Sequence, residues 1–190
     1  VIETGIQVIG DDGSDKTIIK DKVKEPYQTI SGSSDEITFS PGQDVNFDLI
    51  YSTSDSNNSL TGLGIRVHYD SSILTPSGEN NGVTAIEETF GDPLINEDIN
   101  DLDDDKNTDK YIDIIWADLS TEPNFPGGEL PALIANLNFS SSEDGVDSLT
   151  GESKESKINF TSADTATNYD FLNQSVVLKP QSFNLDVDGN

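Results

Sequence analysis

Apolar side chains alternate with polar ones along three long stretches of this 190-residue chain, and this spacing limits what the chain can fold into. A period of two places every second side chain on the same face of a β-strand. The pattern therefore predicts three strands, each with one face in a core. Their apolar members are Val45, Phe47, Leu49 and Tyr51; Leu63, Ile65, Val67 and Tyr69; and Leu133, Ala135, Leu137 and Phe139.

Shorter strands are expected where apolar residues cluster between segments rich in turn-forming residues. Gly, Ser, Asn, Asp and Pro dominate connecting segments such as 52–59 and 140–152, a composition typical of turns. No segment has the 3.6-residue period of an amphipathic helix. We therefore predict an all-β protein, an antiparallel β-sandwich of about nine or ten short strands. The shorter candidates are residues 6–9, 17–19, 37–39, 83–86, 111–116, 157–160 and 175–178.

Composition also suggests how the chain is divided. Residues 1–25 hold four of the ten basic residues and predict an N-terminal arm or an added edge hairpin. Residues 26–180 form the predicted sandwich, since 33% hydrophobic residues suffice for one modest core. Pro180 ends the last strand, and residues 181–190 form a separate linker element. The chain lacks an initiating Met and a leader, so we expect an internal or processed segment.

The net charge excludes several classes of partner. With 36 acidic and 10 basic residues, the chain carries a formal charge of −26, which opposes binding to nucleic acid or to anionic membrane surfaces. Its apolar runs are far shorter than the roughly 20 residues needed to span a bilayer, so we expect no membrane insertion. Because the chain has no Cys, it has no disulfides, thiolate zinc sites or Cys nucleophiles.

Much of the negative charge falls in one segment. Ten acidic residues lie between Glu87 and Asp109, with only Lys106 opposing them. Oxygen-bearing side chains at alternate positions can converge on one hard cation, which would offset their mutual repulsion. We therefore predict a Ca²⁺ site in or beside this segment; the alternative is a solvated acidic loop. The candidate ligands are Asp101, Asp103, Asp105, Asn107 and Asp109.

The last five residues carry a second calcium-type pattern. They read D-x-D-G-N, which matches the first half of an EF-hand loop, with oxygen ligands at positions 1, 3 and 5. The candidate ligands are Asp186, Asp188 and Asn190. Because the sequence stops before the later ligands, we expect only weak binding by these residues alone. The alternative is an acidic turn.

The remaining chemistry-bearing residues give weaker signals. His68 is the only imidazole, and its parity in the strand predicts an exposed side chain near Arg66 without a catalytic role. Carboxylate pairs are too abundant to identify a glycosidase. Trp116 and Tyr111 are candidates for stacking on a sugar ring, although Trp116 closes an apolar strand and is also expected in the core.

Several motifs resemble those of cohesins and related carbohydrate-binding modules. The stretch Pro41–Leu49, followed by Leu60–Leu74, is similar to the opening strands of such modules, and Leu133–Phe139 is similar to a later strand. Ser182–Asn190 resembles the start of a dockerin-like calcium repeat in large secreted bacterial proteins. The resemblance implies a nine-stranded jelly-roll sandwich, an extracellular location, no catalysis, and a role in binding or assembly. The acidic insertion from about Phe90 to Lys110 departs from classical cohesins.

These observations lead to one main functional hypothesis and one alternative. The chain is expected to be a non-catalytic, calcium-binding interaction or structural module of a secreted or cell-surface multidomain protein. Its partner would be another protein module, in a cohesin-like or adhesion role. The alternative is a carbohydrate-binding module of a secreted hydrolase or adhesin, with an extracellular polysaccharide as partner. The sequence leaves the oligomeric state open.

Overall fold

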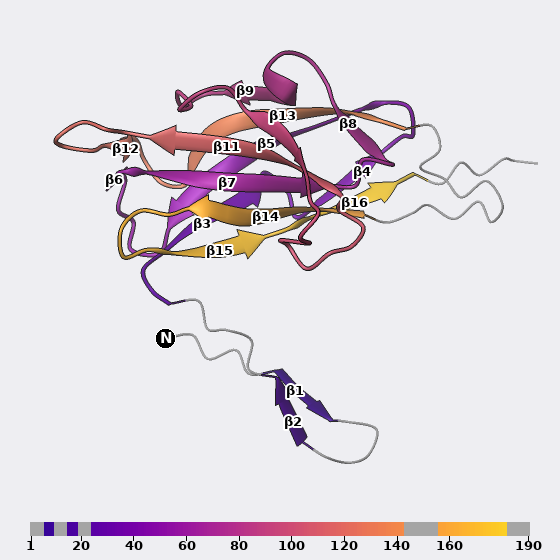
Figure 1. Ribbon diagram of the computed structural model, residues 1–190, viewed down its shortest axis with the longest axis horizontal. Helices are drawn as coiled ribbons and strands as arrows, with labels where there is room; N and C mark the ends of the chain where they lie inside the picture. Colours follow the sequence, from indigo (N-terminus) through magenta and orange to yellow (C-terminus); the bar gives the residue numbers. More distant parts are fainter. Residues whose placement is uncertain (1–5, 10–14, 19–23, 143–155, 182–190) are drawn as a thin grey trace, which may run out of the picture.

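The computed structural model describes residues 6–9, 15–18, 24–142 and 156–181, and these residues form a β-sandwich. Two six-stranded sheets make up its layers (Figure 1). In this part of the chain the only helical element is η1 (Asn80–Gly82), a single 3-10 turn. Among the described residues, no helix has the length and apolar character needed to cross a membrane.

The first sheet, sheet I, has the strand order β10-β11-β7-β14-β16-β4. Its neighbours are antiparallel except for β16 and β4, which run parallel. The strands are β4 (Glu36–Phe39), β7 (Gly62–Tyr69), β10 (Leu94–Glu97), β11 (Lys110–Ala117), β14 (Ser156–Asp164) and β16 (Val176–Pro180).

The second sheet, sheet II, has the order β15-β3-β5-β13-β8, with β9 also paired to β13. Here β15 and β3 run parallel. Its strands are β3 (Tyr27–Gly32), β5 (Asp44–Thr53), β8 (Leu74–Pro76), β9 (Val83–Ala85), β13 (Ala132–Ser141) and β15 (Asp170–Gln174). Two short antiparallel pairs lie outside the sheets: β1 (Ile6–Ile9) with β2 (Asp15–Ile18), and β6 (Ser59–Leu60) with β12 (Phe125–Pro126).

One apolar core fills the space between the sheets. The inward residues of β5 and β7 belong to it, as the period-two pattern predicts. The ring of Phe125 lies between Tyr51 and Trp116, with its centroid 5.1 Å from the Tyr51 ring and 6.2 Å from the Trp116 ring. Each large apolar side chain buried in this way contributes about 1.5–3 kcal/mol to folding.

The predicted fold class is confirmed, with differences in detail. The described residues form sixteen strands rather than about nine or ten. Several of the additional strands, such as β6, β8 and β12, have only two or three residues and present too few positions for a period to be visible. The two parallel pairs also differ from the fully antiparallel expectation. In these pairs β15 runs parallel to β3 in sheet II, and β16 runs parallel to β4 in sheet I.

For the long strand β13, the prediction of which residues face the core is wrong at the start of the strand. Leu133 was expected to share the core face with Ala135, but a register irregularity lies between these two residues where β13 pairs with β5. Ile134 and Ala135 are both buried, and Leu133 is exposed. A bulge adds one residue to a strand and so reverses the parity of what precedes it.

Two core tyrosines make the fold sensitive to alkali. Burial raises the pKa of both Tyr51 and Tyr69 to about 12 from the ordinary value of 10.0. The phenol therefore remains protonated in the folded chain at a pH where the unfolded chain has lost the proton. This contribution to stability is complete below pH 10 and is lost as the pH rises through about 12.

We predict that the free energy of unfolding falls between pH 10 and pH 12 by about 2 kcal/mol for each of these tyrosines. Urea unfolding followed by far-UV circular dichroism at a series of pH values measures this decline. Tyr69→Phe removes one titrating group and should make the decline shallower. An identical decline in wild type and variant would contradict the assignment.

Candidate functional site

The acidic segment forms a loop with its own internal hydrogen bonds. This acidic loop, residues 98–109, connects β10 to β11 at the edge of sheet I. The Asp98 N–H donates to the Asp109 carbonyl (2.8 Å), and the Leu102 N–H donates to the Asp98 carboxylate (3.1 Å). Asp101 and Asp104 have φ values of 53° and 57°, a left-handed conformation that Asp adopts more readily than most residues. The loop therefore turns tightly without glycine.

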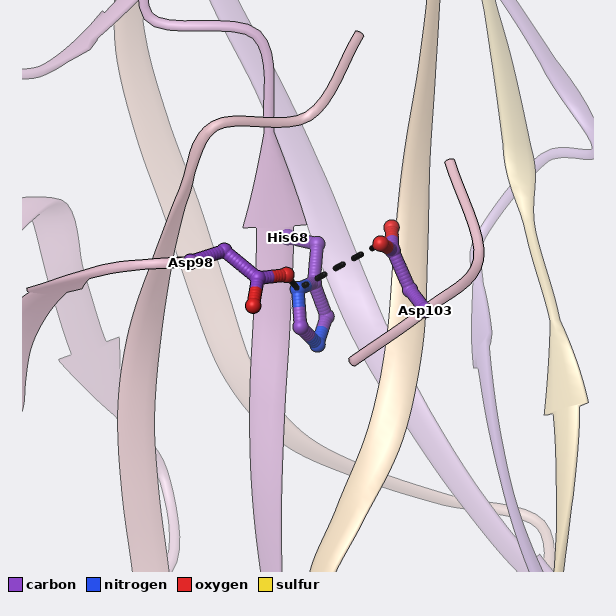
Figure 2. Close-up of side chains that lie close together, drawn as sticks. All are labelled: His68, Asp98 and Asp103. Atoms are coloured by element: carbon purple, nitrogen blue, oxygen red, sulfur yellow. Dashed lines mark hydrogen bonds and ion pairs between the residues drawn. The ribbon is translucent and has the colours of Figure 1, made fainter. Parts of the chain in front are cut away.

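His68 fixes the acidic loop to the outer face of sheet I. Its Nδ1 lies 2.8 Å from Asp98 Oδ2 and its Nε2 lies 2.7 Å from the Thr161 hydroxyl. Asp103 approaches from the other side, with Oδ1 3.9 Å from Nδ1 (Figure 2). The side chains of His68, Asp98 and Asp103 are all 0% exposed. A β7 residue and two loop residues thus form one buried polar cluster.

The burial of His68 corrects the expectation of an exposed imidazole. The predicted parity is right, because His68 pairs with Tyr111 and Asn159 and alternates with the core residues of β7. The acidic loop, however, covers this part of the outer face. Asp98, His68 and Thr161 are hydrogen-bonded in series. The arrangement accounts for anchoring of the loop.

A second set of contacts links the acidic loop to β14. The Asn159 Nδ2 donates to Asp103 Oδ2 (2.8 Å) and to Asp105 Oδ2 (3.3 Å). The Thr108 hydroxyl also donates to Asp103 (2.7 Å). A polar hollow opens at this junction, lined by Asp103, Asp104, Asp105, Asn107, Ser156, Lys157, Asn159, Asn173 and Ser175.

The predicted calcium ligands of the acidic loop separate into two groups. Asp103, Asp105 and Asn107 line the hollow. Asp109 instead accepts hydrogen bonds from the Ser71 N–H (2.7 Å) and hydroxyl (2.6 Å). Burial opposes ionisation of Asp109, but these bonds outweigh it and lower the pKa of this carboxyl. Asp101 does not line the hollow, although its Oδ1 is buried and has no hydrogen-bond partner in the described structure.

Sequence reasoning missed the residues that surround these ligands. His68, Asp98, Ser156 and Asn159 come from three separate segments, and only Asp98 belongs to the acidic run. The available signal was Asn159, a polar residue between two apolar ones in a predicted strand, which places it on the outer face. The second calcium-type pattern, with Asp186, Asp188 and Asn190, lies outside the described residues.

The two aromatic candidates for sugar stacking occupy different positions. Trp116 is 1% exposed, and its Nε1–H donates to the Glu87 carbonyl (3.1 Å). The predicted core position of Trp116 is therefore confirmed, and its ring is not available to a sugar. Tyr111 is half-buried on the outer face, where its ring centroid is 5.3 Å from that of His68 and 5.7 Å from the Arg66 guanidinium carbon.

Apolar side chains are exposed on and beside the open part of sheet I. Leu94 pairs with Asp113 in the adjacent strand, and Ile115 pairs with Gly64, so both side chains lie on the outer face. Ile115 and Leu119 line a hollow of about 170 Å³ beside Gly64. The Phe90 N–H donates to the Ile115 carbonyl (2.6 Å). We call these four exposed residues, Phe90, Leu94, Ile115 and Leu119, the apolar patch.

We predict that His68→Ala lowers the free energy of unfolding by about 2–4 kcal/mol, because the buried Asp98 carboxylate then loses its imidazole partner and keeps only the Leu102 N–H. Thr161→Val is the matched control: it removes only the bond to Nε2 and should cost about 1 kcal/mol. Urea unfolding followed by the fluorescence of Trp116, the only Trp, measures both. Equal effects of the two variants would contradict the anchoring role of His68.

Comparison with known proteins supports the fold. No protein-family model matches the sequence, and no curated protein matches it either. Among solved structures, the sixth cohesin of scaffoldin B from Acetivibrio cellulolyticus, in complex with a Cel5 dockerin, is similar over 83% of this chain and 100% of its own, with a TM-score of 0.52 and 15% identity.

A second similar structure is the CaDoc0917–CaCohA2 complex, matched over 81% of this chain and 99% of the other with a TM-score of 0.52 and 14% identity. At such low identity the similarity concerns the fold alone. The chain therefore has a cohesin-like β-sandwich fold.

Proposed function

We propose that this chain is a non-catalytic module that binds another protein module within a secreted or cell-surface multidomain protein. The observation that carries the proposal is the apolar patch, which lies on and beside sheet I of a cohesin-like sandwich. The two similar structures are of cohesins, one of them in complex with a dockerin, and dockerins are protein modules. Exposed apolar side chains gathered on one face of a soluble domain typically mark an interaction site.

The charge of the chain indicates the kind of partner. Asp113 and Asp164 lie beside the apolar patch, and the chain as a whole carries −26. A partner with acidic groups at the interface would be repelled, whereas basic groups around an apolar centre would complement this surface. We infer a partner that places apolar side chains on the patch and Lys or Arg at its rim.

Calcium binding at the acidic loop is the second part of the proposal. The side chains of Asp98 and Asp103 are fully buried, and Asp103 and Asp105 converge on one Asn159 amide. A neutral amide donor satisfies the carboxylate oxygens but leaves their negative charge uncompensated. A bound Ca²⁺ would supply the compensating positive charge, and it requires only oxygen ligands. We infer that it stabilises the folded loop.

We predict that Leu94→Glu with Ile115→Glu abolishes binding to a dockerin module. A panel of recombinant dockerin modules, titrated against the immobilised chain, measures this. Leu133→Glu is the matched control, because Leu133 is 38% exposed but lies on sheet II. Wild-type affinity should weaken with added salt if basic groups form the rim. Binding retained by the double variant, or no binding to any module, would contradict the proposal.

We predict that Ca²⁺ at about 100 times its Kd raises the melting temperature by roughly 5–10 °C over the value in EGTA, since binding to the folded state alone adds about 2.7 kcal/mol. Differential scanning calorimetry measures the shift. Mg²⁺ at the same concentration is the control and should have a smaller effect, because it demands stricter geometry and gives up its water less readily. An unchanged midpoint would rule out calcium stabilisation.

A further inference from the structure

We propose that the free edge of β10 binds an extended segment of a partner protein, which adds a strand to sheet I. This segment carries apolar side chains at its centre and Lys or Arg at its ends. The inference goes beyond the module-binding function proposed above. The two surfaces share Leu94, which belongs to β10 and to the apolar patch, but the new site is defined by the backbone of the edge strand.

The register of β10 shows which of its backbone groups point outward. β10 is the last strand of sheet I and pairs with β11, with Ile95 opposite Ile112. In the same register, the Asp98 N–H donates to the Asp109 carbonyl. Hydrogen-bonded and non-hydrogen-bonded pairs alternate along an antiparallel ladder. Ile95 and Glu97 therefore form non-hydrogen-bonded pairs, and their N–H and C=O groups point away from β11.

These outward groups are available to another chain. No hydrogen bond among the described residues involves the N–H or C=O of Ile95 or Glu97 on this side. Two residues before Ile95, the Pro93 carbonyl accepts a hydrogen bond from the Asn81 amide (2.7 Å), so a group outside the sheet already bonds to this edge. An extended backbone offers donors and acceptors at the same two-residue spacing, whereas a helix uses most of its own internally. The edge therefore fits a strand.

The side chains of β10 distinguish it from the other sheet edges. Leu94 is 61% exposed on the outer face. Ile95 pairs with the core residue Ile112 and shares its inner face, yet it is 39% exposed. In β4, β8, β9 and β15, the strands at the remaining edges, no large apolar side chain is exposed. Edge strands that must stay unpaired are usually protected by charge or by cover. An added strand would cover apolar residues on both faces of β10.

The charge around β10 determines which chain fits the edge. Asp92 lies just before the strand, and the acidic loop that follows it holds six Asp residues and one Lys. Antiparallel pairing with β10 of a second copy would place the acidic loop of each copy beside Asp92 of the other. Repulsion between like charges opposes such a dimer. The fitting occupant is therefore a different chain, with Lys or Arg on both sides of an apolar centre.

Titration of a defined peptide against the full chain tests the inference. The probe is a peptide of alternating Val and Thr with Lys residues at both ends. One matched control is the same peptide N-methylated throughout its Val and Thr segment, which lacks backbone donors there. A second control has Glu in place of Lys. Isothermal titration calorimetry should show saturable binding of the probe, and each control peptide should bind more weakly by roughly tenfold or more.

A pair of variants locates the peptide on β10. Ile95→Pro removes an outward N–H without removing a hydrogen bond to β11, and edge strands tolerate proline at such positions. It should weaken binding of the probe by roughly tenfold or more. The matched control Ile95→Val keeps the N–H and should bind like the wild type. Far-UV circular dichroism checks that both variants are folded.

Amide hydrogen exchange of the wild type gives a second measurement, which decides if Ile95→Pro does not fold. Saturating probe should slow exchange at Ile95 and Glu97 by roughly tenfold or more. Exchange at Asn96, whose N–H points to β11, should not change.

The possible results separate strand addition from module binding. No binding of the probe, or equal binding of the probe and its N-methylated form, would overturn strand addition. Equal binding by the wild type and Ile95→Pro would overturn it as well. A dimer that light scattering detects and Ile95→Pro disrupts would make a second copy the occupant and overturn the proposal. Loss of dockerin binding in the Leu94→Glu and Ile115→Glu double variant is read separately and would leave the module-binding proposal intact in each case.

Discussion

Alternation of side chains between the two faces of each strand is the constraint on which the rest of this structure depends. In β7, Ile65 and Val67 point into the core, so Arg66 and His68 must lie on the outer face. Neighbouring strands in register then place Tyr111 and Asn159 beside His68. A slip of one residue would bury Arg66 and expose the core residues. The register that builds the core therefore also assembles the polar cluster on the outside.

The acidic loop is held by contacts that compensate its charge only in part. Burying carboxylates is costly unless hydrogen bonds and opposite charges offset the loss of water. The Asp98 carboxylate accepts a hydrogen bond from the Leu102 N–H and lies against the His68 ring. The Asp103 carboxylate accepts hydrogen bonds from the Thr108 hydroxyl and the Asn159 amide. Most of these groups are neutral donors, in a chain whose net charge is already −26. This imbalance is the physical reason to expect a cation at the loop rather than a loop folded by hydrogen bonds alone.

The sequence predicts the parts of the structure that depend on local pattern. It places Val45 to Tyr51 and Leu63 to Tyr69 in strands and Trp116 in the core, because each follows from the two-residue period. It does not predict the bulge near Leu133, which is set by pairing with β5. Nor does it predict the burial of His68, since the covering residue Asp98 lies 30 positions away. For the same reason, it does not predict that Asn159 of β14 contacts the loop.

The outer face of sheet I brings the acidic loop and the apolar patch onto the same strands. Tyr111 connects them, because its ring contacts His68 under the loop and lies beneath Arg66 on the open part of the face. On the proposed arrangement, a divalent cation in the loop changes the local charge by two positive units next to the partner-binding surface. Because unscreened electrostatic effects extend about 8–10 Å at physiological salt, this change acts on groups at the rim of a docked partner. The cation would weaken the attraction between the loop carboxylates and the basic groups of the partner nearest to them. It would also order the loop at the edge of the binding surface. The same carboxylates would therefore stabilise the loop by binding the cation and select the partner by their negative charge, and these two demands oppose each other.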